Sequence, residues 1–230
     1  MRDYIVVSFF TLILIACTKS EKDSQFDILE NNYRNFYWSY HPEQAFNVGI
    51  HQFDDLLIIP NNLNRKTYLD GLKNYASSFD KLNKTQLSNE NQAGLDSIRL
   101  QIKGEIKMLT VDKPYEWNPA YIDLETAFRK LLFSKHTALH IRIKQISTKL
   151  KYLSPYYETM KNNLQNPPAE LTRIAIQQNQ SLSKFLNTDF RHNVINSKIL
   201  SNKEKEYMSR QIAIVNVAIN EYISFCKSCL

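Results

Sequence analysis

His136 and His140 come nearest to the spacing of a known catalytic motif. They are four residues apart in the segment His-Thr-Ala-Leu-His, and on one helical face this spacing lets zinc hydrolases present two imidazole nitrogens to the metal. The general base of that motif, a Glu directly after the first His, is replaced by Thr137, which cannot take a proton from zinc-bound water at neutral pH. We therefore predict two ordinary histidines at a helix end, with no metal site and no catalytic residue in this chain. The sequence leaves open whether another histidine approaches the pair in space: His41, His51 or His192.

Cys226 and Cys229 form a C-x-x-C pair one residue before Leu230. In thioredoxin-like proteins such a pair begins a helix, whose dipole lowers the thiol pKa. Here the pair follows a predicted helix, where the dipole has the opposite sign, so we predict no redox activity. A disulfide and two free thiols remain as alternatives.

Residues 5–16 form an unbroken apolar run after the single cation Arg2. The run is too short to cross a hydrocarbon core of about 30 Å and has the character of a signal-peptide core. It ends in Leu14-Ile15-Ala16-Cys17, the pattern of a bacterial lipobox, in which the Cys thiol receives the lipid. We predict a lipoprotein signal peptide over residues 1–16, lipidation at Cys17, and a lipid anchor in the bacterial cell envelope, at the outer membrane or the periplasmic face. An ordinary secretory signal and an uncleaved anchor are the alternatives.

The composition excludes several classes of fold and partner. Only 4 Gly and 7 Pro occur in 230 residues, too few for the frequent tight turns of an all-β protein. Neither G-x-G-x-x-G nor G-x-x-x-x-G-K-[ST] occurs, so a Rossmann or P-loop nucleotide site is excluded. The net charge is +6, but the 29 cations are scattered along the chain, and we predict no nucleic-acid partner.

Apolar residues recur at three- and four-residue steps along most of the chain, which predicts amphipathic helices. The predicted faces are Phe26, Leu29, Tyr33, Phe36, Tyr37 and Tyr40; Tyr68, Leu72, Tyr75, Phe79 and Leu82; Leu95, Ile98, Ile102, Ile106 and Leu109; Leu124, Phe128, Leu131 and Leu132; Leu139, Ile143, Ile146, Leu150 and Leu153; Leu171, Ile174, Ala175, Gln178, Leu182 and Phe185; and Met208, Ile212, Val215, Ala218 and Tyr222.

Boundary signals accompany these faces. We predict N-caps at Ser24, Ser88 and Asn166, a capping box at Ser201 and Glu204, a helix end at Pro42, and an end or kink at Pro155. The polar residues 17–24 are predicted to be a flexible tether, and residues 49–64 and 111–119 lack a helical period. The expected fold of residues 25–230 is all-α, an irregular array of about eight helices with little or no sheet.

The segment 42–55 contains the pattern P-x-x-A-x-x-x-G-x-x-x-[FY]-D-D. It resembles the N-terminal signature of the bacterial domain-of-unknown-function family 885. Further segments agree with that family in order and spacing from about residue 26 onwards: Leu87-Ser88, residues 118–121, Arg142 with Leu150 and Pro155, Asn163-Leu164, residues 167–178, and the last helix through Ala218 and Tyr222.

The resemblance implies a mostly helical, exported lipoprotein. Members of that family are more than twice as long and are grouped with zinc metallopeptidases, because their C-terminal half carries an HExxH-type helix and a further Glu ligand. No residue here matches those ligands. The resemblance therefore implies a truncated or split member that is inactive alone, with zinc only in the missing half and a separately encoded C-terminal half as a partner. The alternatives are a free-standing lipoprotein that binds a peptide or other ligand in a groove lined by Tyr and Trp, and an enzyme whose site the sequence does not reveal.

Overall fold

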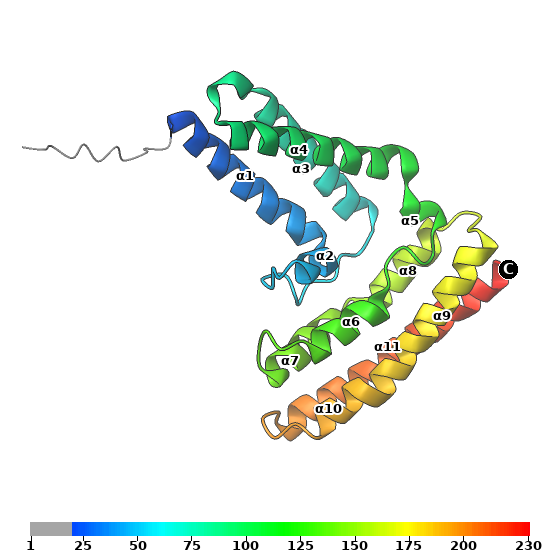
Figure 1. Ribbon diagram of the computed structural model, residues 1–230. Coiled ribbons are helices and arrows are strands. Elements are labelled where there is room, and N and C mark those ends of the chain that lie inside the picture. Colours follow the sequence, from blue (N-terminus) through cyan, green and yellow to red (C-terminus); the bar gives the residue numbers. More distant parts are fainter. Residues whose placement is uncertain (1–19) are drawn as a thin grey trace, which may run out of the picture.

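The computed structural model describes residues 20–230 and is 77% helical (Figure 1). Within these residues there is no strand, and eight helices have seven or more residues. The predicted all-α fold of about eight helices is therefore confirmed. The predicted signal peptide and Cys17 lie outside the described residues.

The helices are α1 (Glu21–Tyr40), α2 (Pro42–Asn47), α3 (Asn62–Asp80), α4 (Asn89–Lys107), α5 (Pro114–Trp117), α6 (Leu124–Phe133), α7 (Leu139–Leu150), α8 (Leu153–Asn163), α9 (Ala169–Phe185), α10 (Arg191–Ile195) and α11 (Asn202–Ser228). A 3₁₀ turn at Lys84–Gln86 precedes α4, and π-helical turns at Met108–Asp112 and Leu186–Phe190 follow α4 and α9.

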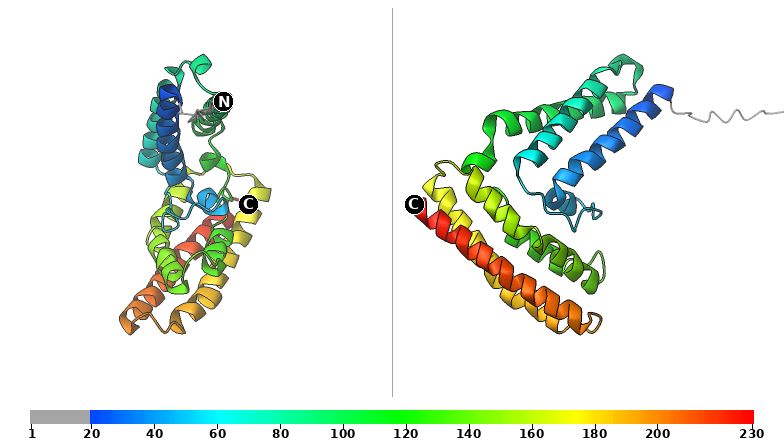
Figure 2. Two further views of the ribbon diagram at one scale, coloured as in Figure 1. Left: turned by 60° about the vertical axis from the view of Figure 1, so that its left-hand side comes forward. Right: turned by 180° about the vertical axis from the view of Figure 1, so that it is seen from behind.

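The buried side chains form two hydrophobic clusters. The N-terminal cluster joins α1, α3 and α4 around residues such as Phe26, Leu72 and Ile98. The C-terminal cluster joins α6 to α11 around residues such as Phe128, Ile146 and Ile212. The two sets of helices diverge from the neighbourhood of α5, and α2 lies between them at the end of α1 (Figures 1 and 2).

The first helix begins earlier than the sequence suggests. Ser20, not Ser24, is the N-cap, because its hydroxyl accepts the backbone N–H of Asp23. Asp23 is buried and accepts hydrogen bonds from Ser88 N and Asn91 Nδ2 at 2.9 and 2.8 Å. The last four residues of the predicted tether are thus helical, held by contacts with the start of α4.

Several other predicted boundaries are confirmed, and two more need correction. Ser88 caps α4, Pro42 follows the end of α1, and the capping box of Ser201 with Glu204 is present. Pro155 does not end a helix: it lies in the first turn of α8, where its missing N–H has no intrahelical partner to lose. Asn166 is not an N-cap, because its φ of 46° is left-handed and Pro168 holds the cap position.

The buried face of α9 differs from the predicted stripe at two polar positions. Thr172 and Asn179 are buried, whereas Ile174 is 38% exposed. Asn179 accepts the hydroxyl hydrogen of Tyr157 and donates to the carbonyl oxygen of Ala175. Hydrogen bonding therefore compensates the burial of a polar side chain that a hydrophobic pattern assigns to the surface.

No helix among residues 20–230 combines the length and the apolar character needed to cross a membrane.

Candidate functional site

A pocket of about 300 Å³ lies between the two hydrophobic clusters. Its lining comes from the end of α1 and the start of α2 (Tyr40, His41, Glu43, Gln44), the following connection and α3 (Leu57, Ile58, Ile59, Pro60, Asn64, Arg65, Tyr68), and the segment from α4 to α6 (Met108, Leu109, Pro114, Tyr115, Tyr121, Ile122, Asp123). The predicted non-helical segments 49–64 and 111–119 thus both contribute to this pocket, although short helical turns occupy parts of the second.

A hydrogen-bond network joins two lining residues of the pocket, His41 and Tyr68, to Glu105, which is not part of the lining. Tyr68 donates its hydroxyl hydrogen to Glu105 Oε2 over 3.2 Å, and His41 Nε2 lies 2.8 Å from the Tyr68 hydroxyl and 3.3 Å from the same carboxylate oxygen. Since the Tyr68 hydrogen is used on Glu105, His41 Nε2–H is the donor to the Tyr68 oxygen. Tyr40 stacks on Tyr68 with ring centroids 4.3 Å apart. These contacts fix the aromatic wall in one arrangement.

Burial and the negative charge of Glu105 act together on the surrounding phenols. Burial is the main reason why the pKa of Tyr68, Tyr33, Tyr37 and Tyr121 is raised, and the Glu105 carboxylate raises each of them further. The four phenols therefore stay neutral at physiological pH. They cannot serve as nucleophiles there.

Arg65 brings a positive charge to the lining of the pocket. Its guanidinium lies over the Tyr115 ring, 4.0 Å from the centroid, and donates to the carbonyl oxygen of Pro60. Asn163 on α8 donates to the same carbonyl oxygen at 2.8 Å. The connection between α2 and α3 is thereby tied to both clusters, which keeps the pocket open without a ligand.

The motif of residues 42–55 has a clear structural meaning. Pro42 begins α2, where its missing N–H costs no hydrogen bond, and Ala45 is fully buried. Gly49 has a φ of 81°, and the bonds Gly49 N to Phe46 O and Ile50 N to Ala45 O complete a Schellman ending of α2. A side chain at position 49 would be strained in this left-handed conformation. The motif thus turns the chain into the segment that carries His51 and Asp54.

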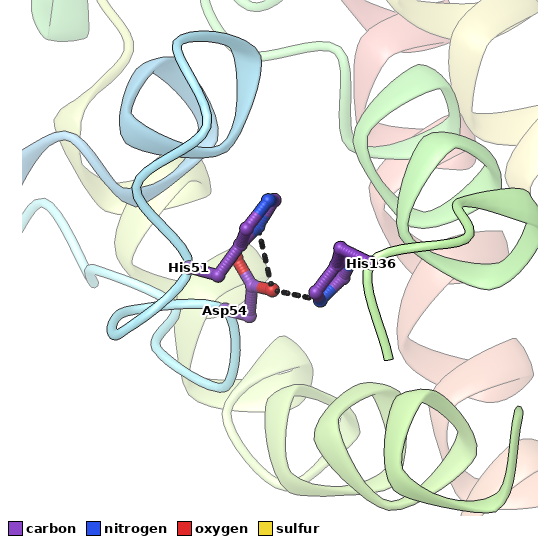
Figure 3. A group of neighbouring side chains, drawn as sticks. All are labelled: His51, Asp54 and His136. Carbon is purple, nitrogen blue, oxygen red and sulfur yellow. Dashed lines mark ion pairs between the residues drawn. The ribbon is translucent and has the colours of Figure 1, made fainter. Parts of the chain in front are cut away.

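The shared helical face that the spacing of His136 and His140 suggests does not form. His136 lies in the loop before α7, whereas His140 is the second residue of that helix, so the two do not share a helical face. His51 approaches His136 instead, with ring centroids 3.7 Å apart, and Asp54 completes the group (Figure 3). His41 belongs to the aromatic pocket and His192 to α10. The sequence left such an approach open but could not identify Asp54 as a member.

The C-x-x-C residues lie at the end of α11, as expected. Cys226 is the buried member, Cys229 occupies the C-cap, and both thiols are free. Burial raises the pKa of the Cys226 thiol to about 11. A thiol with this pKa is almost fully protonated at neutral pH and is a poor redox nucleophile.

Comparisons with known proteins show the fold but not the family. No family model and no curated protein matches the chain. A solved structure described as "a putative lipoprotein of unknown function" from Shewanella oneidensis superposes with a TM-score of 0.83 at 23% sequence identity, over 88% of this chain. The match spans 37% of that protein's length. The resemblance to family 885 therefore remains a prediction.

Proposed function

We propose that this chain is an exported, lipid-anchored helical protein that binds a ligand in the aromatic pocket and supplies no catalytic residue of its own. The observation that carries the proposal is the preformed pocket between the clusters, whose wall is aromatic and aliphatic and whose few polar groups are already oriented. Ligand pockets have this composition, and a volume of about 300 Å³ lies at the lower end of their usual range.

The chemistry of the lining suits a short peptide segment. Tyr40, Tyr68 and Tyr115 offer apolar faces for side chains, while Arg65 can bind a carbonyl or carboxylate oxygen and the Glu43 carboxylate can accept an N–H. A mostly apolar lining with a few charged groups suits the mixture of side chains and amides in a peptide.

Ligand-observed NMR on a library of short peptides with aromatic or aliphatic side chains tests this proposal. We expect saturation transfer to a subset of the library in the wild type. Met108→Trp should abolish it, because the larger side chain fills the pocket. Leu100→Trp is the matched control, since Leu100 is 72% exposed on α4. No transfer in the wild type, or equal transfer to both variants, would contradict a ligand site here.

The larger context that we propose follows the resemblance to family 885. In that context the chain is the non-catalytic part of a longer lipoprotein, and hydrolysis and its zinc ion belong to a C-terminal half. The length of the structural neighbour supports this arrangement, because its fold extends beyond the part that matches this chain. A reading frame for an HExxH segment directly after the codon for Leu230 would favour a split protein, and the absence of one would favour a free-standing binding protein.

A further inference from the structure

Three metal-ligating side chains meet between the segment after α2 and the loop before α7 (Figure 3). Asp54 Oδ2 lies 3.2 Å from His51 Nδ1 and 2.9 Å from His136 Nε2. The Asp54 side chain is fully buried, whereas the His51 and His136 side chains are 33% and 17% exposed. The group is therefore closed on the carboxylate side and open to solvent on the histidine side.

The hydrogen bond of Ser134 fixes the tautomer of His136. Ser134 donates its one hydroxyl hydrogen to the carbonyl oxygen of Leu131, so its oxygen can only accept from His136 Nδ1, which lies 2.8 Å away. While the ring is neutral, Nε2 therefore carries a lone pair that faces Asp54.

Asp54 has no well-aligned hydrogen bond, although two imidazole nitrogens lie within reach of its Oδ2. His51 Nδ1 is likewise buried and without a well-aligned partner. A buried carboxylate that faces two imidazole nitrogens in this way is costly unless a positive charge lies between them. The parallel stacking of the two rings makes double protonation of the histidines unfavourable as well.

The distances within the group are those of a metal coordination sphere. Bonds of about 2.0–2.2 Å to zinc place neighbouring ligand atoms roughly 2.9 Å apart in octahedral and 3.4 Å apart in tetrahedral geometry. The observed 2.9 and 3.2 Å fall in this interval, and the separation between the two imidazole nitrogens is at most 4.8 Å. Because the two rings stack in parallel, one of them has to tilt for both lone pairs to point at the same ion. A hydrogen bond from Nδ1 to a neighbouring oxygen is also the usual support of a ligating His.

The neighbouring cations leave the centre of the group free. Lys149, whose charge acts on Asp54, is buried and paired with Glu43 at 3.2 Å. Arg142, whose charge acts on His136, donates to the carbonyl oxygen of Leu132. Their positive charges disfavour cations that bind through electrostatics alone, such as Mg²⁺ and Ca²⁺. Two imidazoles favour a borderline transition metal instead.

We propose that His51, Asp54 and His136 bind one divalent transition-metal ion of the zinc class, with solvent at the remaining position. The ion fixes the segment after α2 to the loop between α6 and α7. This site uses His136 without His140, so the prediction of no metal site, which concerned a zinc-hydrolase motif built on that pair, does not extend to it. The general base of a zinc hydrolase is still missing, and the ion has a structural role.

Zinc binding by the chelator-treated full chain in detergent micelles tests the site. Equilibrium dialysis with ZnCl₂, in a Cys229→Ser background that removes the C-x-x-C pair, should give one ion per chain. We expect His136→Ala and His51→Ala to weaken binding by about 100-fold or more, and Ser134→Ala to weaken it by roughly 10- to 100-fold, as for other outer-shell partners. His140→Ala, four positions away on α7, is the matched control and should bind like the parent.

Cobalt absorption provides a second readout, because visible d–d bands of Co²⁺ should appear in the parent and disappear in His136→Ala. Circular dichroism checks that each variant is folded. If His136→Ala does not fold, His51→Ala replaces it as the ligand variant, because the His51 side chain is 33% exposed. Absence of stoichiometric zinc in the parent would overturn the proposal. The group would then be explained by a proton that Asp54 and His136 share. Equal binding in the His51, His136 and His140 variants would overturn it as well.

Discussion

Replacement of Gly71 by Ala tests the close contact between α1 and α3 that supports the aromatic wall. A Cβ on Gly71 would lie 2.6 Å from Phe36 Cε2 and closer still to Cζ. The Phe36 ring cannot move away easily, because it contacts the rings of Tyr40, Tyr68 and Tyr75 at centroid distances of 5.3, 5.5 and 5.2 Å. The substitution therefore disturbs Tyr68 and the pocket behind it.

The expected effect is the difference of two opposing contributions. Ala in place of Gly within a helix stabilises the folded state by about 0.5–1 kcal/mol, whereas overpacking of a well-packed contact costs about 1–3 kcal/mol. Gly71→Ala should therefore lower the free energy of unfolding by about 1 kcal/mol. Gly104→Ala is the matched control on α4, because no atom lies within 4 Å of its added Cβ. This variant should be stabilised by about 0.5–1 kcal/mol.

Urea unfolding followed by far-ultraviolet circular dichroism measures both variants. For a chain of this size, about 1 kcal/mol corresponds to a shift in Tm of roughly 2–4 °C, so thermal unfolding should move the two variants in opposite directions. Equal stabilisation of both would refute the reasoning, since it would mean that the Phe36 ring relaxes without cost. A loss of stability in Gly104→Ala would show that the helical preference was misjudged.

Three further predictions follow from particular residues. Hydrogen bonds from Lys144 and Ser201 lower the pKa of Glu204 to about 2. The stability that this carboxylate contributes is therefore present above about pH 4.5 and is lost as the pH falls towards 2. Glu204→Gln should flatten that part of the plot of unfolding free energy against pH. Metabolic labelling with a palmitate analogue should mark the wild type but not Cys17→Ser, and equal labelling would refute lipidation. The purified chain should leave a mixed peptide library uncut even with zinc bound, and cleavage that a chelator abolishes would reveal a catalytic base that we have not identified.

Local signals in the sequence predicted most of the helices, because each signal depends on residues three or four positions apart. The Ser88 cap, the capping box at Ser201 and the apolar face of α6 all follow from such spacings, and the structure contains them. The errors occurred where a distant contact decides a local outcome. The start of α1 was misplaced because Asp23 bonds to Ser88, 65 residues away.

The same distinction explains why the histidine group could not be found from spacing. The separation of His136 and His140 satisfied a helical pattern, but the helix begins only at Leu139, and the true neighbours of His136 are His51 and Asp54, more than 80 positions earlier. The sequence shows the motif that contains Asp54 but not the role of Asp54, because Asp54 and Asp55 look equivalent in the sequence. Burial separates them: Asp54 is enclosed and has no well-aligned hydrogen bond, while Asp55 is exposed. An acidic residue buried without a well-aligned hydrogen bond requires a cation or a proton, and that requirement becomes visible only when the fold brings the two segments together.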